Sequence, residues 1–209
     1  MTGPSHARRR AVVVAGHQGD TETARSGLDD ADPAVRSSAL GALDRAGRLD
    51  DDTIRRALTD RAPSVRRRAC ELAATRPSVS LLRALDLDED PTVVEVAAWA
   101  CGEQVDHGTP VDADAIIDRL CSLATAAEDP LVREASAASL GAIGDERGLP
   151  AILHACTDLP HIRRRAVLAL APFDGPDVVA AIDAALADRD WQVRQAAEDL
   201  RRATGEFPI

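Results

Sequence analysis

Apolar residues recur along the chain with a helical spacing, and one short pattern returns six times. Its clearest copy, residues 32–43, reads Asp-Pro-Ala-Val-Arg-Ser-Ser-Ala-Leu-Gly-Ala-Leu. Successive copies are 30, 28, 39, 30 and 31 residues apart. A self-similar period of this size is typical of stacked-repeat proteins. The five further copies begin at Pro63, Pro91, Pro130, Pro160 and, with Trp in the place of Pro, Trp191.

Within each copy, an apolar anchor is followed by a small residue four positions later and by apolar or small residues seven and eight positions later. This spacing places all of them on one stripe of an α-helix. A small residue in the middle of the stripe allows another helix to approach closely. The anchors are Val35, Val65, Val93, Val132, Ile162 and Val193.

Each stripe carries signals for the start of a helix, and several carry signals for its end. An Asp precedes every stripe and can cap the free N–H groups of the first turn, while Pro is well suited to the first helical position. We therefore expect caps at Asp32, Asp60, Asp90, Asp129, Asp158 and either Asp188 or Asp190. Glycine is common just after a helix end, which predicts ends at Gly47, Gly102, Gly144 and Gly205.

A second apolar segment precedes each stripe, as at residues 54–58 and 178–186. Each repeat is therefore predicted to be a pair of antiparallel helices, and such pairs must stack because none can bury its apolar face alone. We expect an all-α protein, an α-solenoid of about six helix pairs in one domain over residues 1–209, with a frayed tail at residues 1–10. The predicted repeats are roughly 21–47, 50–75, 77–103, 113–144, 146–174 and 176–204.

The motifs at residues 32–43 and 129–145 resemble HEAT-like repeats, in detail the short type found in phycobilin-lyase-related proteins. The resemblance covers nearly the whole chain and implies a right-handed superhelix. It says little about function, because the motif residues are the packing residues. It also implies that the Arg after each anchor pairs with a turn Asp of its own or a neighbouring repeat. This structural ladder comprises Arg36, Arg66, Arg133, Arg163 and Arg194.

The third repeat departs from the pattern, since Val94 replaces the ladder Arg and Trp99 stands six residues after the anchor. Trp99 is predicted on the side away from the apolar stripe, with Glu95 one turn earlier. The resemblance implies that this helix lines the concave face. We predict a partner-binding surface of Trp99 and Glu95, with Arg67 and Arg164 at the position of Glu95 in other repeats. The alternative, that Trp99 packs against repeat four or the following loop, stays open.

The 39-residue step between the third and fourth copies implies an insertion of about nine residues, which we assign to a loop at 103–112. Insertions in repeat arrays map to loops and often carry function. Asp106, His107, Asp112 and Asp114 have no recognised metal-ligand spacing. We interpret the segment as a solvated loop and expect no metal and no cofactor.

Charge is distributed unevenly over the chain, whose net charge is −10. Residues 1–76 carry +3, residues 77–131 carry −10 and residues 132–209 carry −3. An acidic middle beside an exposed Trp suits a basic segment of a protein partner, although solubility alone also explains it. All 25 basic residues are Arg, which we interpret as coding bias in a bacterial genome.

The leading functional hypothesis is a non-enzymatic scaffold or adaptor that binds a protein on the concave face. An enzyme or cofactor-handling protein is the alternative, since the resemblance includes bilin lyases and deoxyhypusine hydroxylases; the His-Glu pairs implied for the latter are absent. Nucleic-acid binding of the HEAT-like DNA glycosylase kind is a third class. Arg66–Arg68 and Arg163–Arg165 could contact phosphates, but a pI near 4.9 and an aromatic content of 2% argue against it.

The expected location is the cytoplasm. The four cysteines stand singly within helical stripes, as small buried side chains do in a reducing compartment. The first residues do not show the pattern of a signal peptide, and no apolar run approaches the length of a membrane span. A membrane partner is therefore not expected.

Overall fold

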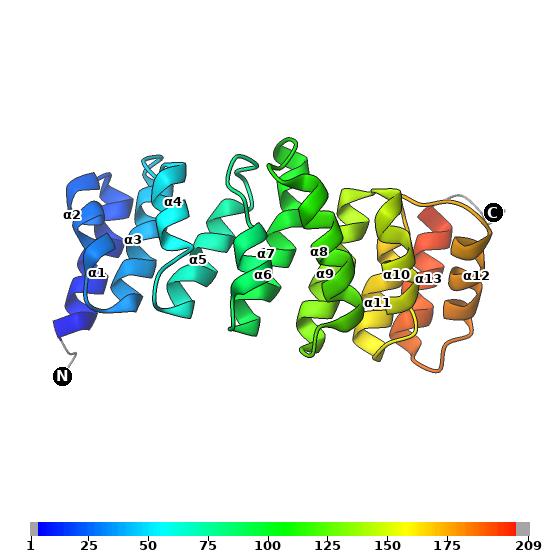
Figure 1. The fold of residues 1–209 in the computed structure, drawn as a ribbon. Helices are drawn as coiled ribbons and strands as arrows, with labels where there is room; N and C mark the ends of the chain where they lie inside the picture. The colour runs from blue at the N-terminus through cyan, green and yellow to red at the C-terminus, as the bar shows by residue number, and fades with distance from the viewer. Residues whose placement is uncertain (1–3, 204–209) are drawn as a thin grey trace.

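The computed structural model of the protein describes residues 4–203, which form thirteen α-helices and three short 3-10 helices with no strand among them. The odd-numbered helices form one layer (Figure 1): α1 (Pro4–Gln18), α3 (Pro33–Arg45), α5 (Pro63–Ala73), α7 (Pro91–Gln104), α9 (Pro130–Ile143), α11 (Pro160–Ala169) and α13 (Trp191–Ala203). The second layer comprises α2 (Thr21–Ser26), α4 (Asp51–Ala57), α6 (Leu82–Leu87), α8 (Ala113–Ala126), α10 (Leu149–Ala155) and α12 (Pro176–Leu186). The 3-10 helices are η1 (Gly27–Asp29), η2 (Val105–His107) and η3 (Glu146–Gly148).

The two layers form an elongated stack along which the chain advances pair by pair (Figure 1). Each odd helix contacts the next odd helix along the whole array, and each even helix packs against the odd helix that follows it. All six apolar anchors are at most 3% exposed. The protein is therefore an α-solenoid, which confirms the fold predicted from the repeated stripe.

Small residues set the close approach of the odd helices. At Gly141 of α9, an added Cβ would come within 2.6 Å of the Cα of Ala169 on α11. At Gly102 of α7, it would come within 2.9 Å of the hydroxyl oxygen of Ser139 on α9. Both contacts lie below the distance at which real side chains pack, so these backbones meet where no larger residue fits.

The helix end predicted at Gly102 is wrong. Gly102 lies inside α7, which continues to Gln104 because the glycine serves helix contact rather than termination. Gly47 and Gly144 follow α3 and α9 with φ of 64° and 68°, the left-handed conformation that glycine adopts at such ends. Gly205 lies outside the described residues.

The start of the chain also differs from the prediction of a frayed tail over residues 1–10. Helix α1 begins at Pro4, and its side chains bond to the turn before α3. Arg8 donates from Nε to the Oδ2 of Asp30 at 2.7 Å, and the hydroxyl of Ser5 donates to the carboxylate of Asp32. These polar contacts hold the first helix on the array.

The predicted caps divide into two groups. The carboxylates of Asp32, Asp90 and Asp129 accept a hydrogen bond from a backbone N–H in the first turn of α3, α7 and α9. For Asp60 and Asp158 the prediction is wrong, since α5 and α11 begin without a side-chain cap and both carboxylates lie one or two positions further out. Before α13, the residue that bonds to the first-turn N–H is Asp190 rather than Asp188.

No helix within residues 4–203 combines the length and apolar character that crossing a bilayer requires.

Candidate interaction surface

Four of the five ladder arginines form two-pronged ion pairs with a turn Asp of the following repeat. Arg36 on α3 donates from Nη2 and Nε to the two carboxylate oxygens of Asp60, at 2.6 and 2.8 Å. Its Nη1 also donates to the backbone carbonyl of Asp30, at 2.8 Å, so one guanidinium joins two repeats. The same arrangement recurs at Arg66–Asp88, Arg133–Asp158 and Arg163–Asp188. The last ladder residue, Arg194, donates to the carbonyls of Asp188 and Arg189.

These ion pairs shift the titration of their carboxylates. The guanidinium of Arg133 lowers the pKa of Asp158, and that of Arg163 lowers the pKa of Asp188, because each hydrogen bond favours the ionised carboxylate. At Asp60, burial acts to raise the pKa, but the bond from Arg36 and a backbone N–H outweigh it and the pKa is lowered. Each of these four Arg–Asp pairs, here called a rung of the ladder, is thus ionised at neutral pH and joins two repeats.

One rung is missing, at the junction of α7 with α9. Val94 stands at the Arg position, and Ala127 stands at the position of the turn Asp, so both partners of the ion pair are replaced. A cleft opens at this place with a volume of about 580 Å³. The corresponding clefts beside the Arg36–Asp60 and Arg66–Asp88 rungs measure about 150 and 250 Å³.

The cleft combines an apolar floor with a predominantly acidic rim. Leu85, Val94, Leu123, Ala127 and Val132 supply the apolar part. The charged lining residues are Asp88, Glu89, Arg119, Glu128 and Asp129.

Two of the rim charges are already paired. Asp88 holds the guanidinium of Arg66, and Arg119 lies 3.0 Å from the carboxylate of Asp86. Within residues 4–203, no ion pair engages Glu89 or Glu128, and both are exposed. The rim therefore presents uncompensated negative charge to solvent.

The residues predicted to bind a partner lie on three odd helices. Trp99 and Glu95 share a face of α7, and Trp99 is 43% exposed, so a large part of it is accessible to solvent. Arg67 lies on the adjoining helix α5, with its Nη1 3.3 Å from a carboxylate oxygen of Glu71. Arg164 is exposed on α11, separated from α7 by α9, so it is not a neighbour of Trp99.

The segment predicted as a solvated loop at 103–112 begins with the end of α7 and with η2, whereas residues 106–109, 111 and 112 are exposed, as that interpretation expects. Gln104 ends α7 with 0% exposure, and its Nε2 lies 3.0 Å from each of the carbonyls of Ala73, Arg76 and Val79. The N–H of Val111 donates to the carbonyl of Pro77 at 2.9 Å. The insertion thus fastens onto the connection between α5 and α6.

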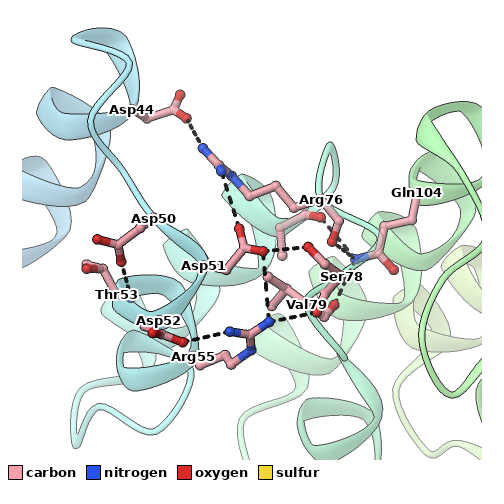
Figure 2. Close-up of polar contacts among 11 residues, drawn as sticks. Asp44, Asp50, Asp51, Asp52, Thr53, Arg55, Arg76, Ser78, Val79 and Gln104 are labelled. Carbon is pink, nitrogen blue, oxygen red and sulfur yellow. Dashed lines mark hydrogen bonds and ion pairs between the residues drawn. The ribbon is translucent and has the colours of Figure 1, made fainter.

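Figure 2 shows that the same connection is held from its other side by charged residues. Arg76 lies 3.4 Å from the carboxylates of both Asp44 and Asp51. The hydroxyl of Ser78 donates to Asp51, and Arg55 donates to the carbonyl of Ser78 at 2.9 Å. We regard this network as structural, because its polar groups are directed at the chain itself.

Among residues 4–203, no group of three or more His, Cys, Asp or Glu side chains is placed to hold a metal ion. Asp114, from the segment considered for a metal, instead pairs with Arg147 at 2.8 Å. Burial raises the pKa of the Cys70 thiol to about 12, so it stays protonated and unreactive.

A sequence model of HEAT repeats matches residues 78–159 and again residues 117–201, together more than half of the chain. The chain belongs to the HEAT repeat family. The odd helices are thus the second helices of HEAT pairs, and the ladder joins consecutive repeats. A comparison with curated protein sequences gave no match.

Several solved repeat proteins have a similar fold. YibA of E. coli superposes with a TM-score of 0.66 at 16% identity, over 96% of this chain and 75% of YibA. A designed armadillo repeat protein in complex with the peptide (KR)4 gives 0.65 at 17% identity, over 88% of this chain and 99% of the design. An engineered protein gives 0.61 at 21% identity, over 90% and 97%. At these identities the likeness concerns the fold of the HEAT array alone.

Proposed function

We propose that this HEAT array is a non-enzymatic scaffold that binds a protein partner along the exposed face of its odd helices. The observation that carries the proposal is Trp99, which is 43% exposed in the middle of the array. Large aromatic side chains dominate the binding energy of protein interfaces, and this chain has only two Trp and two Phe.

The layer of odd helices is also the surface that a partner would find concave. Every odd helix contacts its successor, and these contacts are more extensive than those between any two consecutive even helices. The more closely packed layer is the inner one in a curved stack, and solenoids bind their partners on that side. In this proposal Trp99 and Glu95 form the centre of the surface, Arg67 borders it and Arg164 extends it.

Charge supports a partner with a basic segment. Residues 77–131, which include α7, carry a net charge of −10. Opposite charge on the partner would steer association and fix its register. A designed armadillo repeat protein of similar fold binds the alternating Lys-Arg peptide (KR)4, which is a precedent for this chemistry on such a surface. The proposal includes a single domain and a bacterial cytoplasmic setting, which fits the free thiols.

The test is capture of partners from a bacterial lysate by the tagged protein, with and without nuclease, identified by mass spectrometry. Wild type is compared with Trp99→Ala/Glu95→Arg. Trp191→Ala is the matched control, because Trp191 is 65% exposed but stands at the start of α13, far along the array from α7.

We expect one discrete protein that survives nuclease treatment, is retained by Trp191→Ala and is lost with the α7 variant. Retention by all three proteins would refute the assigned surface. A signal that vanishes with nuclease would move the protein to the nucleic-acid class, and a small molecule copurifying with visible absorbance would favour the cofactor-handling alternative.

A further inference from the structure

The cleft at Val94 is the place of a rung that the chain does not fill. Val94 is 7% exposed, and its short apolar side chain stands at the position from which other repeats extend an Arg guanidinium. Ala127 likewise removes the carboxylate that would have received it. The cleft is more than twice as large as the one beside the neighbouring Arg66–Asp88 rung, about 580 against 250 Å³. The space that an Arg occupies elsewhere is open here.

The filled rungs indicate what such a space accommodates. In each, the aliphatic stem of the Arg lies between two repeats, and the guanidinium bonds both to a carboxylate and to a backbone carbonyl in the turn before its own helix. At α7 the corresponding carbonyl is that of Asp88, and no guanidinium from α7 reaches it, because Val94 has none. The floor contributed by Leu85 and Leu123 suits an aliphatic stem.

The charge of the rim has the sign that a guanidinium requires. Glu89 and Glu128 are free of ion pairs within the described residues, and they border the cleft from the turns before α7 and α9. Asp129 accepts the N–H of Leu131 through Oδ1, which leaves its Oδ2 available. The one cation of the lining, Arg119, is paired with Asp86 and so does not neutralise these groups.

We propose that the cleft between α7 and α9 receives an arginine side chain of the protein partner, which completes the ladder from outside. This inference rests on the proposed function and names one contact of it. Pro91, Glu95 and Trp99 follow one another at intervals of four along α7 and share a face, and Pro91 also lines the cleft. A basic segment lying over Trp99 therefore reaches the cleft by continuing along the same helix.

Arginine is favoured over lysine by geometry. A planar guanidinium can bond to a carboxylate with two parallel N–H groups and still offer a third donor to a carbonyl, as the filled rungs do. A lysine ammonium is a compact and strongly hydrated charge without this fork. The cleft should thus discriminate between two residues of equal charge, which a merely acidic surface would not do.

The experiment titrates the full chain with N-acetyl-arginine methylamide, with the lysine and norleucine analogues as comparison probes, and follows backbone amides by NMR. We expect the arginine probe to shift residues 85–94 and 123–132 with an affinity at least fivefold above that of the lysine probe. The norleucine probe should cause no saturable shift.

Two variants make the test specific. Val94→Arg/Ala127→Asp refills the rung without changing the net charge, and it should weaken binding of the arginine probe at least tenfold. Glu89→Gln/Glu128→Gln changes exposed residues only, so it should fold normally, and it should weaken binding severalfold. Trp99→Ala/Glu95→Arg tests whether the cleft binds arginine independently of the Trp99 surface. Its affinity for the arginine probe should stay within about twofold of wild type.

The proposal is overturned if arginine and lysine probes bind alike, if shifts spread over the whole acidic middle, or if the refilled variant binds as wild type does. The probe titration needs no partner, so it tests the cleft alone. If the titration fails but Trp99→Ala/Glu95→Arg loses a captured protein, the scaffold function is still supported. Conversely, specific arginine binding with no captured protein would support the cleft and count against the scaffold.

Discussion

The junction of α5 with α7 and the junction of α7 with α9 are built on the same plan, but only the first keeps its Arg–Asp ion pair. At the first, Arg66 holds Asp88 through two bonds of 2.6 and 2.8 Å. At the second, Val94 and Ala127 occupy the corresponding positions, and a cleft remains. The odd helices nevertheless stay in contact across both junctions.

The difference shows that the stack does not depend on every rung. Where the ion pair is absent, α7 and α9 approach closely through Gly102, and the hydroxyl of Ser139 donates to the carbonyl of Ala98 at 2.6 Å. Both partners of the rung are replaced together, which avoids leaving a partly buried charge alone. A junction that keeps its packing but gives up its ion pair is free to serve another purpose.

Breaking a filled rung from one side should have the largest effect on stability. Arg36→Met leaves Asp60 without its partner in a position where its side chain is 16% exposed, and we expect a loss of about 2–4 kcal/mol, as for other buried pairs cut on one side. Chemical denaturation followed by circular dichroism measures it. The control is Val94→Met, at the same position of the vacant junction, which should cost under about 1.5 kcal/mol. Equal losses in the two variants would show that the rung contributes nothing.

Refilling the vacant junction should have a smaller effect of opposite sign. Ala127→Asp alone adds a carboxylate beside Glu128 and Asp129, and Val94→Arg alone places a cation against apolar side chains. Together they should restore the pair, with a coupling energy of about 1–2 kcal/mol in a double-mutant cycle. Denaturation of the four proteins gives this number. A coupling near zero would mean that the backbone at this junction no longer fits a rung.

Lowering the pH should produce the smallest difference in stability between proteins with and without a given rung. The pKa of Asp158 and that of Asp188 are lowered in the folded protein, so each rung stabilises the fold fully above the unfolded value of about 3.9 and loses that stabilisation as pH falls through the folded pKa. Melting temperatures measured between pH 6 and 3 should therefore fall less steeply for Arg133→Gln/Asp158→Asn than for wild type. A parallel fall would show that the rung does not titrate with folding.

The architecture could be predicted from the sequence because one period specifies it. Anchors spaced about 30 residues apart, each with a small residue four positions later, leave little choice but stacked helix pairs. The same pattern exposed Val94 as a departure. The sequence does not single out Ala127, because aspartates in these turns also suit helix caps, and only the structure separates the capping residues from those that pair with Arg.

The sequence could not predict the details that depend on neighbouring repeats. It predicts Trp99 on the side of its helix away from the apolar stripe but leaves its exposure open, because periodicity does not show which residues pack against that side. The sequence pattern predicts a loop at Gln104, because Gly102 resembles a helix end, whereas close contact with Ser139 explains that glycine. The cleft itself depends on the distance between two helices, which no pattern of residue types encodes.

The spacing of the rungs also bears on how the chain reaches its fold. Every ladder pair joins residues only 22 to 25 positions apart, so each closes a short loop at little entropic cost and can form early. The bond from Ser139 to Ala98 spans 41 positions and has no rung beside it. Folding should thus start independently in the repeats before and after the α7–α9 junction, and the packing of these two parts against each other should be the slower step.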